Sequence, residues 1–450
     1  MTESRNKYAF LWVSLLIVAG VALMQVLGNT VGLIAVMLLF GAIVVLAAVK
    51  DMAIPLLMFF LPWSPLIKLV PGSTSMYTIA LIAVLLVFLV RNSKKFAILH
   101  IFPAALLFVL TIIVKTVTDS AISGSYIFFF MCMILFPLAA SEREREYDFY
   151  SLVIFFSVGI ITAALSARFL MIFPTISQYI DVIEYNTLTR FSGYYGDPNF
   201  YSAHITAAIG GAILLLFNET KVLRKLTVYL MIAVLLYCGF LSVSKSFALI
   251  LFCMVLLWVL EVLFRKGRIS SKVMMLAALF IGGAYVLSSI LFTDLIDMMM
   301  DRFIGEGNSL SELTTRRSDI WVDYFRFFEE EPMTLVFGKG FIEELVKGRG
   351  SHNIVIQIVY QFGIVGALLT LVWLFEYCRS MLENVRLKTP HIVQILILIG
   401  GSFGPWLGLD LLMFDEFFIM PFFVFLGILY LDRMASPDDD GSEIGDEVAE

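Results

Sequence analysis

Long apolar segments alternate with short polar segments along almost the whole chain. Apolar windows of spanning length recur from Ala9 to Leu431, and an α-helix needs about 20 apolar residues to cross a bilayer. We count fourteen such windows, including one that contains prolines, Met52–Val70. The first window, Ala9–Gly28, lacks a small-x-small cleavage site, so we expect a retained span rather than a signal peptide. The pattern predicts an all-α polytopic membrane protein with about 12 to 14 transmembrane helices and one long outer loop carrying short helices.

Lys and Arg residues recur in alternate loops between these windows. Because bases concentrate in short cytoplasmic loops, both termini are expected in the cytoplasm. The long loop over residues 293–350 lies outside in this topology, since long loops escape the rule. We therefore divide the chain into N-terminal transmembrane helices (1–174), a catalytic transmembrane region (175–434) and an acidic, disordered cytoplasmic tail (435–450).

Composition narrows the class of protein further. Hydrophobic residues make up 60% of the chain and charged residues 15%, which excludes an ordinary soluble globular protein. The four cysteines show no CxxC spacing, and no phosphate-binding loop or GxGxxG motif is present. We expect no metal, no other cofactor and no nucleic-acid partner.

Charged residues are rare on the predicted outer face, and several stand in suggestive places. Arg190 begins the turn-rich segment "RFSGYYGDPNFYSAH", in which Asp197 or Asn199 can cap the following helix. The alternative for this segment is a plain reverse turn with an aromatic belt. Lys245 and Arg168 each lie near the outer end of an apolar window. Both are candidate substrate contacts, with snorkelling to the lipid headgroups as the competing explanation.

The long outer loop contains "LTTRRSDIWVDYFRFFEEEP". The apolar residues Trp321, Phe325 and Phe328 predict a helix that lies on the membrane or on the bundle and ends at the acids before a proline. Arg316 and Arg317 stand at its N-terminus, where backbone N–H groups and the helix dipole also favour an anion.

A second polar cluster, Ser351, His352 and Asn353, opens the apolar run "IVIQIVYQFGIVG". A histidine at this level is suited to take a proton from an attacking hydroxyl, and arginines are suited to a phosphate or pyrophosphate. The alternative is a helix-entry residue that hydrogen-bonds its neighbours. Gly363 and Gly366 predict close packing of the helix behind the cluster.

These residues carry a resemblance to a known family. His352-Asn353, followed by nine residues and "GIVG", resembles the signature of the O-antigen ligase and polymerase superfamily. "RFSGYYGDPN" is similar to an outer-loop motif of that family, and "TTRRSDIW" with the later Gly338 and Gly340 is similar to its Arg…Trp and Gly-x-Gly motifs. The resemblance covers about residues 190–366. Lys245 departs from the pattern, because the family commonly has arginine there.

The resemblance implies a metal-independent, inverting glycosyltransferase whose donor is a glycan on undecaprenyl pyrophosphate. Arg190 and Arg316 would hold the pyrophosphate, with Arg317 as the substitute if the register is off by one, and His352 would activate the acceptor hydroxyl. Other candidates for binding the substrate are Arg317, Lys245, Asn353, Asn199, Asp197 and Arg168.

By analogy within this superfamily, whose ligases have about twelve spans, fourteen spans favour a polymerase of lipid-linked repeat units in the bacterial cytoplasmic membrane. A ligase that transfers the finished glycan to lipid A core or another acceptor has the same motifs. Flippase and chain-length regulator proteins are further expected partners, besides the membrane lipids. A transporter or flippase, with an aqueous cavity near the midplane, and a passive scaffold are the readings from other classes.

Overall fold

The computed structural model describes residues 2–50, 52–70, 73–91, 98–118, 124–140, 148–180, 182–185, 188–265, 317–341, 345–382, 385, 391–412 and 415–434. Helices dominate these residues, and the predicted class, an all-α polytopic membrane protein, is confirmed. Arg316 and the acidic tail 435–450 lie outside the described residues, as do residues 266–316, which include much of the predicted outer loop.

Eight helices within the described ranges are long and apolar enough to cross a membrane. They are α1 (Thr2–Leu27), α2 (Thr30–Val49), α7 (Phe149–Leu170), α9 (Pro198–Asn218), α10 (Val222–Phe240), α11 (Lys245–Arg265), α17 (Ile354–Leu382) and α19 (Glu416–Met434). Shorter apolar helices lie between them: α3 (Ala53–Phe60) with η1 (Leu61–Trp63), α4 (Met76–Arg91), α5 (Ile98–Val117), α6 (Gly124–Ala140) and α18 (Ile392–Phe403) with η5 (Gly404–Gly408).

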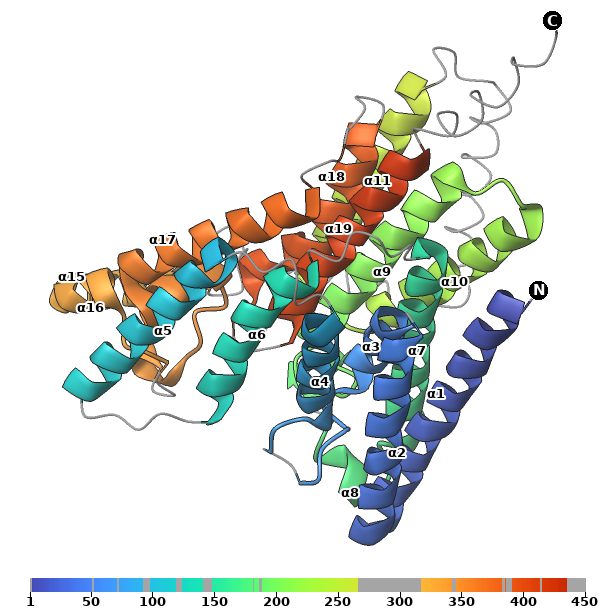
Figure 1. Cartoon of the computed structure of the whole chain (residues 1–450), viewed down its shortest axis with the longest axis horizontal. Coiled ribbons are helices and arrows are strands. Elements are labelled where there is room, and N and C mark those ends of the chain that lie inside the picture. Colours follow the sequence, from blue (N-terminus) through green and yellow to red (C-terminus); the bar gives the residue numbers. More distant parts are fainter. Residues whose placement is uncertain are drawn as a thin grey trace, which may run out of the picture.

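The helices form one bundle in which α9 is central. Figure 1 shows α1 and α2 side by side at one edge and α5 beside α17 at the opposite side. The small residues of α9 let α18 approach closely, as is common between membrane helices. The Thr206 hydroxyl donates to the Gly401 carbonyl oxygen at 2.8 Å, and a Cβ atom at Gly210 would lie 3.3 Å from the Ile397 carbonyl oxygen.

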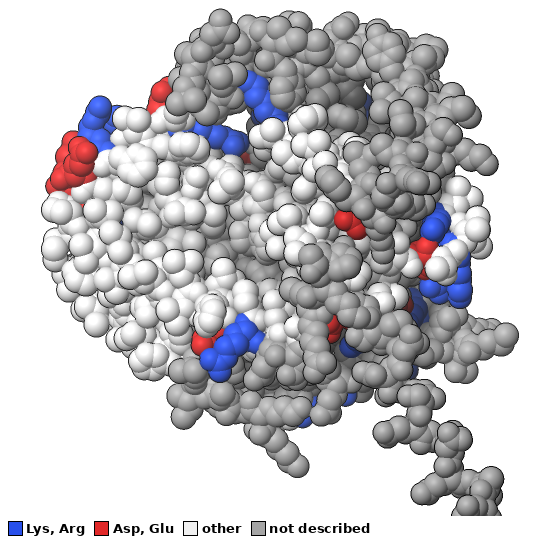
Figure 2. All heavy atoms as spheres, turned by 90° about the horizontal axis from the view of Figure 1, so that it is seen from above, with Lys and Arg blue, Asp and Glu red and all other residues white. Residues whose placement is uncertain are grey.

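Large parts of the molecular surface carry no charge. Figure 2 shows a broad face almost free of Lys, Arg, Asp and Glu, with small charged groups near its margins. Leu38, Leu230 and Phe252 are among the apolar side chains that are exposed on the long helices. Such a surface is stable only against lipid.

The proline-containing window Met52–Val70 does not form one long helix. The helical part ends at Trp63, and Pro62 and Pro65 follow closely on one another where the chain leaves it. Side chains from other segments donate to carbonyl groups on both sides of this helix end. The Tyr195 hydroxyl donates to the Leu61 carbonyl at 2.7 Å, and Ser75 donates to the Ser64 carbonyl at 2.6 Å.

The helix α17 is broken at Gly363, which has a φ of 68°. An L-residue disfavours this left-handed conformation, and a Cβ atom here would collide with the backbone of Val336. The segment around Lys339 and Gly340 donates hydrogen bonds to carbonyls in the turn of α17 before the break. The Lys339 N–H donates to the Tyr360 carbonyl at 2.9 Å, and the Gly340 N–H donates to the Gln361 carbonyl at 2.7 Å. Gly366 stays helical and packs tightly against neighbouring side chains, as predicted.

Two further elements lie at the end of the bundle that carries the polar segments. A short hairpin, β1 (Val182–Tyr185) and β2 (Leu188–Phe191), was not expected in an all-α protein. Its strands are rich in β-branched and aromatic residues, which favour strands. The predicted amphipathic helix is α15 (Arg317–Glu330), and α16 (Pro332–Phe337) follows after the acids.

Candidate functional site

The mouth of α17 is built around a carboxylate that follows α18 and η5 in the chain. Asn353 caps α17, because its side-chain oxygen accepts from the amides of Val355 at 3.0 Å and Ile356 at 3.2 Å. The hydroxyl of the fully buried Ser351 donates a hydrogen bond to Oδ1 of Asp410 at 2.6 Å. The backbone N–H of Asn353 donates to the same oxygen at 3.3 Å. These contacts hold the Asp410 carboxylate in one orientation.

His352 faces the other oxygen of this carboxylate. Its Nδ1 lies 3.7 Å from Oδ2 of Asp410, and the side chains are 37% and 22% exposed. Nδ1 itself is enclosed, and no hydrogen-bond partner lies within reach among the described atoms. The ring is therefore open to solvent away from Nδ1, while Nδ1 is turned to the acid. At 3.7 Å the contact between His352 and Asp410 is electrostatic rather than a hydrogen bond.

Arg317, the first residue of α15, lies close to the same acid. A Cβ atom at Gly408 would collide with Nη1 of Arg317, so the guanidinium packs directly on the backbone of η5. Desolvation lowers the pKa of Arg317, and the charges of Asp197 and Asp410 act in the opposite direction. The group stays charged, because the ordinary pKa of arginine is so high. The two acids offset part of the positive charge of this guanidinium, and its planar, bidentate geometry is suited to a phosphate that competes with them.

Two aromatic residues of α15 fix the helix beside the mouth of α17. The Trp321 indole donates to the Ser351 carbonyl at 3.0 Å. The Tyr324 hydroxyl donates to the Arg349 carbonyl at 2.9 Å, and its ring packs against Tyr360 with centroids 5.2 Å apart. The position of Arg317 is therefore coupled to the segment that carries His352.

The N-terminus of α9 and the segment before α11 extend this polar surface. Asp197 caps α9 by accepting from the Asn199 amide at 2.6 Å. The Asn199 side-chain oxygen accepts from Ser244 at 2.8 Å, which places Lys245, the first residue of α11, next to this contact. Arg190, on β2 and only 8% exposed, donates through Nε to the Ser242 carbonyl at 3.2 Å.

The structure thus brings most of the predicted residues into one neighbourhood. Arg190 contacts Ser242, in the segment before α11, and Ser244 of the same segment contacts Asn199 at the start of α9. The charges of Asp197 and Asp410 both act on the Arg317 guanidinium. Arg316 is not described, but its neighbour Arg317 is. Arg168 lies exposed in the last turn of α7.

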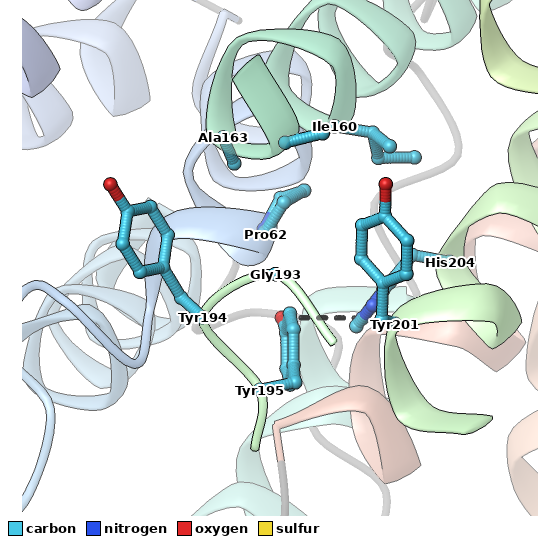
Figure 3. Close-up of a pocket in the computed structure, with 9 residues that line it drawn as sticks. Pro62, Ile160, Ala163, Gly193, Tyr194, Tyr195, Tyr201 and His204 are labelled. Carbon is cyan, nitrogen blue, oxygen red and sulfur yellow. Dashed lines mark hydrogen bonds between the residues drawn. The ribbon is translucent and has the colours of Figure 1, made fainter. Parts of the chain in front are cut away.

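A buried polar cluster lies elsewhere in the bundle. His204 of α9 pairs with Glu416 of α19, with Nε2 and Oε1 2.9 Å apart and side chains 3% and 5% exposed. The Tyr195 hydroxyl lies 3.4 Å from the same nitrogen. Figure 3 shows Tyr195 and His204 on the wall of a small aromatic cavity that Pro62, Ile160 and Tyr201 also line. The pair joins α9 to α19, whose first residue Glu416 follows Asp410 by six positions in the chain.

Asp410, Asp415 and Glu416 were missed by sequence reasoning. The available signal was three acids in "DLLMFDE", a short link between apolar windows on the predicted outer side. Within the described part of the chain, no group of three or more His, Cys, Asp and Glu could hold a metal ion.

Comparison with known proteins adds no assignment: the chain matches no model of a known protein family and no curated protein.

Proposed function

We propose that this protein is a membrane glycosyltransferase that polymerises undecaprenyl-pyrophosphate-linked repeat units into a surface polysaccharide. The proposed place is the outer face of the bacterial cytoplasmic membrane. The observation that carries the proposal is the orientation of His352 toward Asp410, with the Arg317 guanidinium beside the same carboxylate. A base and an anion site in one neighbourhood are the two parts that transfer from a lipid pyrophosphate needs.

In the proposed reaction, a sugar hydroxyl of the acceptor attacks the anomeric carbon of the donor glycan. His352 takes the hydroxyl proton as the new C–O bond forms, and Asp410 stabilises the resulting imidazolium. The bond from the anomeric carbon to the pyrophosphate oxygen breaks at the same time, and undecaprenyl pyrophosphate leaves with the electron pair. Attack opposite the leaving group inverts the anomeric centre.

The guanidinium of Arg317 supports this step by holding the charge that develops on the leaving pyrophosphate. Arg190 and Lys245 are the further cations proposed for the second phosphate. Arg190 donates to the Ser242 carbonyl, and Lys245 directly follows Ser244, which donates to Asn199. Asn353 contributes by capping α17 and fixing Asp410 rather than by offering its amide oxygen to a substrate.

Transport is less well supported by the same geometry. Transporters often coordinate substrate or ions at broken helices near the midplane. The break of α17 at Gly363 is closed by the backbone of Gly338 to Gly340, which occupies the space and the carbonyl groups that an ion would need.

The test is a reconstituted assay with a lipid-pyrophosphate oligosaccharide in nanodiscs. We expect longer lipid-linked glycans and released undecaprenyl pyrophosphate. The variant His352→Asn removes the base but tolerates the left-handed backbone of residue 352, whose φ is 47°. Its turnover should fall by about two to four orders of magnitude, while donor binding is kept.

Lys347→Asn is the matched control, because Lys347 is exposed and has a similar φ of 52°. It should retain nearly full activity. Near-normal turnover in His352→Asn would refute the base role. Transfer only to a lipid A core acceptor would identify a ligase instead, and movement of uncleaved donor across the bilayer would identify a flippase.

A further inference from the structure

The helix pair α15–α16 exposes apolar side chains although it lies outside the spanning helices. Phe325 is 56% exposed, Met333 68%, Val336 37% and Phe337 38%. The opposite flank of α15 is already covered, because Tyr324 and Phe328 pack with Tyr360 in a small core of their own. The exposed group is therefore not the face that attaches the pair to the bundle. We name these four residues the interfacial patch.

The interfacial patch lies at the end of a membrane span. The backbone of Val336 and Phe337 packs directly on Gly363, where α17 is broken. From Ile364 to Leu382 the helix continues for 19 residues (382 − 364 + 1), or about 28 Å at 1.5 Å per residue. This length matches the hydrocarbon core of a bilayer, about 30 Å thick. The Gly363 break, and α16 with it, therefore falls at the boundary of the hydrocarbon.

The apolar surface is continuous across this boundary. Ile364, Val365 and Leu368, the first exposed apolar residues after the break, are 45%, 37% and 58% exposed. They belong to the lipid-facing side of α17, and Val336 and Phe337 continue the same kind of surface onto α16. Lipid that covers the exposed side of α17 would also cover the adjoining apolar side chains of α16.

Four charges of α15 lie on another side of the helix, whereas the exposed Glu329 lies one turn after Phe325. Asp319, Asp323, Arg326 and Glu330 recur at i, i+4, i+7 and i+11, which places them on one stripe. Phe325 lies between that stripe and the buried flank. A helix with one charged stripe and one apolar flank is suited to lie in the plane of the interface.

We propose that the interfacial patch inserts into the outer leaflet, at the boundary between headgroups and acyl chains. The pair α15–α16 is then an interfacial anchor rather than a water-exposed loop. Its insertion does not depend on the proposed function. One consequence does: an interfacial α15 would keep Arg317 near the level at which the phosphates of a lipid-linked donor lie.

Spin labelling in nanodiscs tests the insertion without any substrate. In a background without the four native cysteines, single nitroxides are placed by Phe325→Cys, Met333→Cys and Phe337→Cys. Asp319→Cys and Arg326→Cys are the matched controls on the charged stripe of the same helix. Collision rates with oxygen, which concentrates in lipid, and with a soluble nickel chelate are measured for each labelled variant whose thermal unfolding midpoint is unchanged.

We expect oxygen to dominate at positions 325, 333 and 337, and nickel to dominate at positions 319 and 326, with ratios that differ by about tenfold or more between the sets. Nickel dominance at all five positions would overturn the proposal by showing a water-facing pair. Protection of the patch from both reagents would also overturn it, since a second copy or another protein would then cover the patch.

Discussion

Oδ2 of Asp410 lies 3.7 Å from Nδ1 of His352, although α17 and α18 separate the two residues in the chain. The other carboxylate oxygen is held by the Ser351 hydroxyl at 2.6 Å. Gly350 makes this arrangement possible, because a Cβ atom there would lie 2.5 Å from Oδ2 of Asp410. The acid is thus fixed from one side and turned to the histidine on the other.

Asp410→Asn should lower turnover by about 100-fold or more, because an amide keeps the Ser351 contact but cannot stabilise a protonated His352. Donor binding should change little. The measurement is kcat and donor affinity of the purified protein in nanodiscs. Asp323→Asn is the control, since Asp323 is an aspartate of the same end of the bundle that pairs with Lys347 at 2.7 Å. Equal turnover in the two variants would show that Asp410 does not assist the base.

Gly408→Ala should weaken donor binding by about tenfold, which corresponds to about 1.4 kcal/mol, close to the lower end of the range for a hydrogen bond to a charged group. The added methyl group would displace the Arg317 guanidinium, whose Nη1 occupies that space. The fold should survive, because the end of an arginine side chain can move. The measurement is donor affinity together with the thermal unfolding midpoint.

Gly400→Ala serves as the control for this substitution, because nothing lies within 4 Å of its Cβ position among the described atoms. It should leave donor affinity unchanged. Arg317→Lys should resemble Gly408→Ala, since lysine keeps the charge but loses the bidentate geometry. Unchanged affinity in both Gly408→Ala and Arg317→Lys would exclude Arg317 from the donor site.

Local patterns were sufficient for the helices and for part of the site. The 3.6-residue spacing of Trp321, Phe325 and Phe328 and the acids before Pro332 predicted α15 and its end. His352 and Arg317 were candidates because placing an ionisable residue beside a membrane span costs free energy, so such residues are often functional. These arguments use only neighbours in the chain.

Other features depend on contacts between distant segments. Asp410 looks like any acid in a short link until α18 and η5 bring it to Ser351. Gly363 stands in an unbroken apolar run, so its left-handed φ follows only from the approach of α16. The pairing of His204 with Glu416 joins helices that are far apart in the sequence. No local periodicity contains this information.

Gly363→Ala should destabilise the protein, because alanine must adopt a left-handed φ and its methyl group meets the Val336 backbone. Backbone strain alone costs about 1–3 kcal/mol. The measurement is the thermal unfolding midpoint in detergent, with Gly400→Ala again as the control. A midpoint equal to that of the control would mean that α17 can close into a regular helix at this position.

Asp415→Asn should stabilise the protein at neutral and alkaline pH. Asp415 lies in the loop before α19 and accepts from the Thr78 hydroxyl at 3.0 Å. Burial, followed by the charge of Glu416, raises the pKa of its carboxyl from 3.8 to about 7. The folded protein therefore keeps a proton that the unfolded chain releases between about pH 4 and pH 7, so this group makes stability fall as pH rises through that window.

The stability of the Asp415→Asn variant does not fall in this way as pH rises, because its side chain is neutral at every pH and can still accept from Thr78. Its thermal unfolding midpoint should match that of the wild type near pH 4 and exceed it at pH 8. Asp323→Asn should show the opposite sign, since the hydrogen bond from Lys347 lowers the pKa of Asp323 and its charge stabilises the fold above that pKa. If Asp415→Asn and the wild type unfold with the same pH dependence, Asp415 does not hold a proton in the folded protein, and its carboxylate must be solvated or paired across the whole range.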